Sequence, residues 1–326
     1  MTYFIYRKLK NKPRINCHRS YSKISSIIPT TTPLKILYLQ GVFFMKMTAQ
    51  EFLDWKTKHI TLLAMSGAGK TTLADKLPKS KWYHYSGDYR IGTKYLKEPI
   101  LDNIKRHAMS VPFLRELLRS DSLYIKSKIS FDNLTAVSSY LGKLGDPSKG
   151  GLSLEEFKHR QNLHRHAEIE AMKDVPNFIH NAEDIYGYNH FINDAGGSVC
   201  ELDCPEALEI LAKNTIIIYI KIPPELEQTI IDRAKSDPKP LYYREAFLDE
   251  KLAEYLKLKN YSSTDQMPPD EFVTWVFPEL FKSRIPRYEA IAQQYGYTVD
   301  GNDVANVETE EDFIALIAAA LAKQTG

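Results

Sequence analysis

The sequence lacks any long apolar run and has few cysteines. No stretch reaches the roughly 18 apolar residues of a transmembrane helix, so we expect no membrane-spanning segment. Its three cysteines are Cys17, Cys200 and Cys204, and no second Cys or His pair stands at the spacing of a zinc site. We therefore predict reduced thiols and a cytoplasmic location.

Acidic residues are absent from positions 1–46, which contain nine Lys or Arg. Such a basic head is typical of an organelle transit peptide, or it is a dispensable extension before a start at Met45 or Met47. We favour the dispensable extension and treat 47–326 as one domain. Those residues hold 34 Lys or Arg and 41 Asp or Glu, a net charge of −7. A domain with this net negative charge is not expected to bind a nucleic-acid duplex through its phosphates.

Apolar strand patterns alternate with helical patterns along this domain. The pattern predicts short helical segments at both ends, over 49–57 and 308–323. Continuous or alternating apolar runs predict strands over 59–65, 82–85, 189–193, 215–222 and 297–300. About five strands alternating with helices predict an α/β fold, a doubly wound parallel sheet with helices on both faces.

A glycine-rich turn follows the first predicted strand, in the run Ala64-Met-Ser-Gly-Ala-Gly-Lys-Thr71. Gly67 and Gly69 let the backbone turn its N–H groups toward phosphates, and Lys70 adds a positive charge between them. The Thr71 hydroxyl is a magnesium ligand, and the helix from Lys70 points its positive end at the same anions. The predicted nucleotide contacts are Ala64, Met65, Ser66, Gly67, Ala68, Gly69, Lys70, Thr71 and Thr72.

This run resembles the first motif of the P-loop NTPase superfamily, with Ala64 in place of the first glycine. The resemblance implies binding of a nucleoside triphosphate with Mg²⁺. No Asn-Lys-x-Asp motif for reading guanine is present, so we predict ATP. Asp194 directly follows the third predicted strand, 189–193, and precedes Gly197 by three residues. It resembles the acid that GTPases and adenylate-kinase-like enzymes place near the γ-phosphate. It is our second magnesium ligand, and its alternative role is to cap the next helix.

The run Ser86-Gly-Asp-Tyr-Arg90 stands where the second predicted strand ends. It resembles small-molecule kinases of the adenylate, gluconate and shikimate kinase type. In those enzymes an acid at this place binds the acceptor hydroxyl and in some helps to remove its proton, which implies that role for Asp88. Arg90 would then hold an anionic group of the acceptor. The alternatives are a turn-capping Asp88 and a surface ion pair for Arg90.

Kinases of this type also carry arginines on a mobile lid after their fourth strand. Here a helix begins at Pro223 and Pro224, and Arg233 and Arg244 resemble such lid arginines, with Lys239 assisting. Ordinary helix-surface charges are the alternative. The resemblance covers residues 59–90, 188–235 and 295–325.

Residues 90–185 fall outside the resemblance, and we predict a helical insertion between the second and third strands that sets acceptor specificity. It carries two basic groups, which can bind an anionic acceptor or form solvated helix faces. The first is Arg106, His107, Arg115 and Arg119, and the second is Lys158, His159, Arg160, His164, Arg165 and His166. We favour a solvated face for the second group, and its histidines share no helical face suited to a metal.

Together these patterns predict a kinase that transfers the ATP γ-phosphate to a small-molecule acceptor which the sequence does not name. One alternative is an ATPase that couples hydrolysis to a conformational change in a protein partner. Another is a binding module that ATP organises without turnover.

Overall fold

The computed structural model describes residues 38–39, 42–43 and 45–325. Most of the basic head, including Cys17, lies outside the described residues. All the elements below belong to one unit, residues 33–326. Strands β1 (Tyr38–Leu39) and β2 (Val42–Phe43) form a short antiparallel pair.

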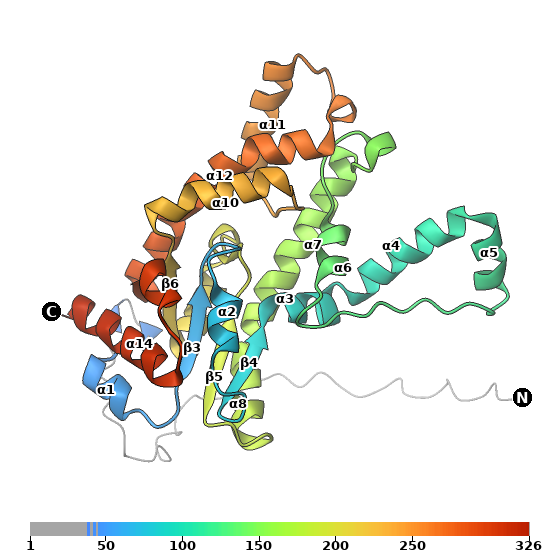
Figure 1. Cartoon of the computed structure of the whole chain (residues 1–326). Helices are drawn as coiled ribbons and strands as arrows, with labels where there is room; N and C mark the ends of the chain where they lie inside the picture. The colour runs from blue at the N-terminus through green and yellow to red at the C-terminus, as the bar shows by residue number, and fades with distance from the viewer. Residues whose placement is uncertain (1–37, 40–41, 44, 326) are drawn as a thin grey trace, which may run out of the picture. The chain divides into compact units, whose positions relative to one another are not determined.

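The centre of this unit is a sheet of five parallel strands (Figure 1). Its strand order is β4-β5-β3-β6-β7. The strands are β3 (His59–Leu63), β4 (Trp82–Ser86), β5 (His190–Asp194), β6 (Ile216–Lys221) and β7 (Gly296–Asp300). The predicted α/β class and the five predicted strands are therefore confirmed. Because the strands are parallel, the carboxyl ends of β3, β4 and β5 lie at one edge of the sheet. Ligands bind at this edge in sheets whose strand order continues to either side of a central strand, as it does here from β3.

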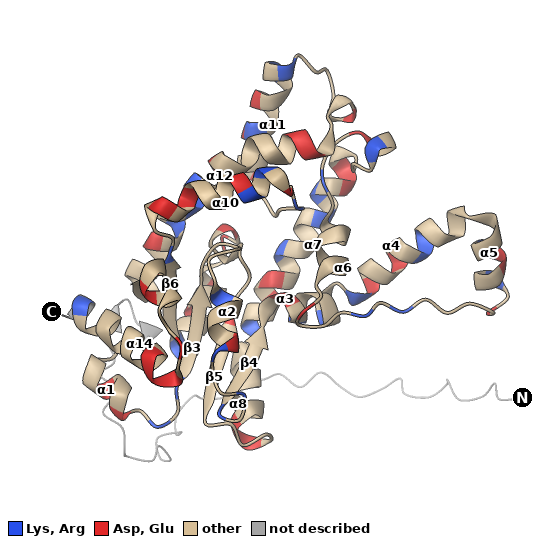
Figure 2. Cartoon of the chain, viewed as in Figure 1, with Lys and Arg blue, Asp and Glu red and all other residues tan. Residues whose placement is uncertain are grey.

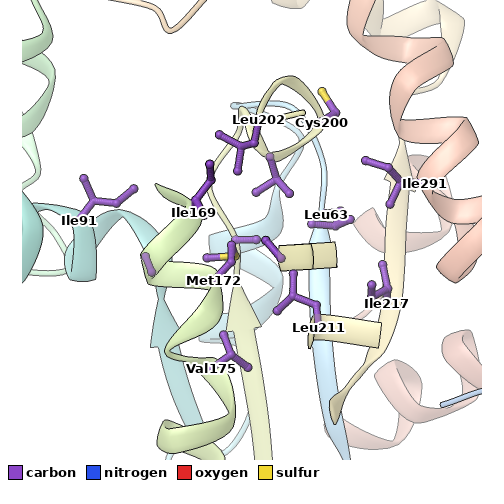
Figure 3. Close-up of a cluster of buried hydrophobic side chains, with 14 of the residues drawn as sticks. Leu63, Ile91, Ile169, Met172, Val175, Cys200, Leu202, Leu211, Ile217 and Ile291 are labelled. Carbon is purple, nitrogen blue, oxygen red and sulfur yellow. The ribbon is translucent and has the colours of Figure 1, made fainter. Parts of the chain in front are cut away.

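Helices cover both faces of the sheet. On one face, Ile218 of β6 packs in a cluster with side chains from α1 (Ala49–Asp54), α2 (Lys70–Asp75), α13 (Gly301–Ala305) and α14 (Glu310–Thr325). On the other face, Leu63 and Ile217 pack with side chains from α7 (Leu154–Lys173), α8 (Val175–Asp184), α9 (Pro205–Asn214) and α12 (Pro269–Tyr295). Figure 3 shows part of this second cluster, including Met172 and Leu211. Burial of each such aliphatic side chain contributes about 1.5–3 kcal/mol to the free energy of unfolding. The two clusters therefore fix the sheet, and with it the edge at which the carboxyl ends of its strands lie.

The chain between β4 and β5 is mainly helical. It contains α3 (Gly87–Arg90), a π-helical turn (Ile91–Tyr95), α4 (Lys97–Ser110), α5 (Pro112–Arg119), α6 (Thr135–Leu141), α7 and α8. Helices α4 and α5 lead away from the sheet (Figure 1). Between α6 and α7 the chain contains one short 3-10 turn, Pro147–Lys149.

The region after β6 contains more helix than the sequence patterns indicated. Helix α10 (Pro224–Ser236) was predicted, but α11 (Glu245–Lys259) and the 27-residue α12 were not. Helix α12 continues through Pro278 and Pro286, residues that usually end or kink a helix. Side chains of α11 and α12, among them Leu252 and Phe272, form a third apolar cluster that supports it. No helix in the described part of the chain is both long enough and apolar enough to cross a membrane.

Candidate active site

The phosphate loop, residues 64–71, joins the central strand β3 to α2. Gly67 and Gly69 have φ angles of 86° and 89°, in the left-handed region where an L side chain is strained. A Cβ built at either position would meet nothing within 4 Å, so the space beside the loop is open. The loop therefore depends on these glycines for its backbone shape and leaves room for a ligand.

Lys70 is the first residue of α2 and is 7% exposed. Its Nζ donates hydrogen bonds to the carbonyl oxygens of Ala64, at 2.8 Å, and Met65, at 3.3 Å. Burial lowers the pKa of Lys70, and the nearby carboxylates of Asp194 and Asp88 oppose that shift. The ammonium group is thus held over the loop by its own backbone.

Asp194 ends β5 and pairs in register with Leu62 of β3 and Ser86 of β4. Its Oδ2 accepts a hydrogen bond from Thr71 Oγ1 at 2.5 Å. Burial disfavours its charge, but the charge of Lys70 and the Thr71 hydroxyl help to bring the pKa of Asp194 below its ordinary value. His84 Nε2 lies 3.9 Å away, an electrostatic distance rather than a hydrogen bond.

A hydroxyl beside an ionised carboxylate is an oxygen donor set that suits Mg²⁺. No group of three or more His, Cys, Asp or Glu side chains in the described residues can hold a metal ion by itself. A cation at Thr71 and Asp194 would therefore take its remaining oxygens from phosphates and water.

Asp88 lies in α3, close to the same edge of the sheet. The side chain that caps α3 is Ser86, whose Oγ accepts from Tyr89 N at 3.3 Å, so Asp88 is not needed as the cap. No hydrogen bond to the Asp88 carboxylate occurs among the residues that the structure describes. Burial and the charge of Asp194 raise the pKa of Asp88, while Lys70 opposes the shift.

The loop after β5 brings Asp88 and the phosphate loop together. A Cβ on Gly196 would lie 3.2 Å from Asp88 Oδ1, and a Cβ on Gly197 would lie 2.9 Å from Ser66 N. Neither position has room for a side chain unless a neighbour shifts. The two glycines therefore set how closely the acidic and phosphate-binding sides approach.

Glu168 of α7 was not predicted, although it is completely buried beside this loop. Its Oε2 accepts a hydrogen bond from Ser198 Oγ at 2.5 Å, and a Cβ on Gly196 would collide with its Oε1. That Oε1 has no hydrogen-bond partner in the described part of the chain. Burial raises the pKa of Glu168 to about 7.

A buried ion cluster of Glu201, Arg244, Arg284 and Arg287 was also missed as a group. Arg284 of α12 donates to Gly197 O at 3.2 Å and to Tyr242 O at 2.7 Å. The fully buried Glu201 carboxylate lies 3.7–3.9 Å from a guanidinium nitrogen of each of the three arginines. The predicted lid residue Arg244 thus belongs to this cluster, and no local motif marked Arg284.

The other predicted arginines lie in different surroundings. Arg90 donates to Asp174 Oδ2 at 2.7 Å and stacks over Phe178, which places it in an ion pair at the start of α8. Arg233 lines a cavity of about 220 Å³ together with Ser66, Gly67, Lys239 and others. The structure therefore brings Arg233, but not Arg90, beside the phosphate loop.

The basic group on α7 forms the solvated face that we favoured only in part, at the exposed His159 and His166. Arg160 and His164 are buried, and Arg160 donates to Glu156 and to Tyr140 O, both at 2.6 Å. Burial lowers the pKa of His164 to about 4, so its ring is neutral. The solvated-face expectation overlooked that α7 is packed on several sides.

Comparisons with known proteins assign no family. No protein-family description and no curated protein matches the chain. Among solved structures, the chain is similar to shikimate kinase from Bacteroides thetaiotaomicron, with 14% identity, a TM-score of 0.33, and coverage of 82% of this chain and 96% of that one. It is also similar to shikimate kinase from Acinetobacter baumannii in complex with shikimate, with 16% identity, a TM-score of 0.34, and coverage of 77% and 86%. Likenesses this distant carry no argument about activity, so the functional conclusion rests on the chain's own residues.

Proposed function

We propose that this protein is an ATP-dependent kinase that transfers the γ-phosphate to a hydroxyl group of a small molecule. The observation that carries the proposal is the convergence of Lys70, the Thr71–Asp194 pair and Asp88 at the carboxyl ends of three adjacent strands. In this proposal the loop binds phosphates, the Thr71–Asp194 pair supplies oxygens to magnesium, and Asp88, whose carboxylate accepts no hydrogen bond from the described residues, faces the acceptor.

The nucleotide has a natural place beside the loop. A cavity of about 290 Å³ adjoins Gly67 and Gly69, and its other walls are largely apolar. They include Leu73, Ile220, Ile222, Pro223, Leu226, Ile230 and Val304. Such walls suit the faces of a purine base, and the preference for ATP rests on the missing guanine motif.

In the proposed reaction the acceptor oxygen attacks the γ-phosphorus, and the bond to the β–γ bridging oxygen breaks. Asp88 takes the acceptor's proton, for which its raised pKa is suited. Lys70 and the loop N–H groups offset negative charge on the phosphates, and Arg233 can approach them from its cavity. Thr71 and Asp194 would hold Mg²⁺, which neutralises phosphate charge.

The test is phosphate transfer from ATP labelled at the γ position, using the full chain, Mg²⁺ and a pooled metabolite extract. Label in a new small molecule supports the kinase and identifies the acceptor. Free phosphate released at one rate with and without extract, and no labelled product, rejects the kinase in favour of an ATPase.

Asp88→Asn separates the acceptor side from nucleotide binding. We expect transfer to fall by about 10²–10⁴-fold, because a general base is lost, while ATP affinity is retained. Asp102→Asn is the matched control, since Asp102 is exposed on α4 and, among the described residues, forms an ion pair with Lys105 alone. Unchanged transfer in Asp88→Asn would contradict the role of Asp88.

A further inference from the structure

The chain carries an arm, residues 104–128, in which several large apolar side chains are exposed. Eleven large hydrophobic side chains are exposed in the described part of the chain, and five of them lie in these 25 residues. They are Ile104, Met109, Val111, Phe113 and Tyr124, and the last two are 71% and 83% exposed. Helix α5, in the middle of the arm, has no buried residue. Apolar patches of this kind mark interaction surfaces.

The backbone of the arm also lacks partners. Residues 124–129 return from α5 toward α6 without helix or strand (Figure 1). Within the described chain, none of their backbone N–H or C=O groups forms a hydrogen bond. Side chains alternate along this segment, with Tyr124, Lys126 and Lys128 exposed and their neighbours half-buried. Such a segment can add to a partner by main-chain hydrogen bonds.

The charge of the arm is opposite to that of the rest of the domain. The arm holds six Lys or Arg and two Asp or Glu, a net charge of +4, whereas the remainder of 47–326 has 28 basic and 39 acidic residues, a net charge of −11. Figure 2 shows basic segments along the arm and acidic ones on helices such as α1 and α14. Arg106, Arg119, Lys126 and Lys128 make no ion pair with any described residue. These cations are therefore available to an acidic surface.

We propose that the arm docks on the acidic body of a second copy of this chain. Charge complementarity favours this contact, because the body of every copy is acidic. Pairing of two arms is disfavoured, since Lys126 and Lys128 would face like charges across an antiparallel pair. A two-fold axis would let each arm rest on the other body and close the dimer.

The test is the mass of the full chain in solution, measured by light scattering and sedimentation over about 1–100 µM, the range of ordinary association. We expect twice the 37.5 kDa of the chain, with weaker association at high salt. The double variant Phe113→Ser/Tyr124→Ser should weaken association by at least about tenfold, because exposed aromatic anchors are lost. Lys126→Glu/Lys128→Glu should weaken it and remove the salt dependence.

The matched control is Ile185→Ser/Tyr186→Ser, which removes an exposed apolar pair outside the arm and should leave the mass unchanged. A monomer at every concentration would overturn the proposal, as would a dimer that the arm variants leave intact. A monomer that binds anionic vesicles or nucleic acid through the arm would likewise overturn it. Circular dichroism and urea unfolding serve as the folding check for each variant, because neither measurement depends on nucleotide binding. This inference is independent of the proposed kinase activity.

Discussion

The phosphate loop and the buried ion cluster lie on either side of Gly197 but are built differently. The loop is one contiguous segment, open on one side, whose lysine is held by its own backbone. The ion cluster combines Glu201 with arginines from α12 and the start of α11, and Arg284 ties the Gly197 carbonyl to Tyr242. In the proposed kinase the phosphate loop binds the ligand, whereas the ion cluster holds the loop after β5 in place.

The largest effect should follow from Arg284→Ala. Removing one partner leaves buried Glu201 with less compensating charge, which costs about 3–5 kcal/mol of unfolding free energy. Urea denaturation measures this loss, and Lys282→Ala, an exposed change in the same helix, is the control. A loss below about 1 kcal/mol, the scale of a surface ion pair, would remove the structural role assigned to the cluster.

Lys70→Ala should have the opposite signature. We expect turnover of ATP to fall by about 10²–10³-fold, because a preorganised charge at the phosphates is lost. Stability should change little, since removing the buried Lys70 charge and weakening the compensation of Asp194 and Asp88 act in opposite directions. Lys79→Ala is the control, an exposed lysine just beyond α2. If Lys70→Ala unfolded the protein, the two sides of Gly197 would not differ as proposed.

Glu168 should make stability depend on pH. Its pKa is about 7 in the folded chain against an ordinary 4.5, so the protonated form favours folding. That contribution is complete below pH 4.5 and is lost as the pH rises through 7, a total of about 3 kcal/mol. Glu168→Gln should abolish this component in urea unfolding between pH 5 and 8. If the free energy of unfolding of Glu168→Gln depended on pH as that of the native chain does, the effect would belong to another group.

Arg90→Ala should have the smallest effect. Its ion pair with Asp174 is partly exposed, so we expect a loss of about 1 kcal/mol or less. Thermal unfolding measures that loss, and the KM for the acceptor should stay unchanged once the acceptor is identified. A rise of about tenfold in that KM would instead support the anion-binding role that the resemblance implied.

The part of the site that could be predicted depends on neighbours along the chain. Apolar runs located β3, β4 and β5, so Asp194 and Asp88 could be placed because they stand where strands end. Glu168 is one of four glutamates on α7, and no sequence pattern sets it apart from the others. Only the packing of α7 against the loop after β5 shows its burial. Arg284 lies between Pro278 and Pro286, where local rules argue against a continuous helix. Tertiary packing overrides those rules, and no short-range pattern reports it.

The hydrogen bonds from Lys70 to Ala64 and Met65 give the phosphate loop a resting shape. A ligand that reaches the ammonium group therefore exchanges partners with two carbonyl oxygens and does not have to order a disordered segment. The ligand's oxygens then compete with the two carbonyl oxygens for the N–H donors of the Lys70 ammonium group. An anion with a single contact gains little by replacing both carbonyls, whereas a chain of phosphates that also engages the loop N–H groups gains more. In the proposed kinase the loop would thereby discriminate between ligands by the number of phosphates as well as by charge.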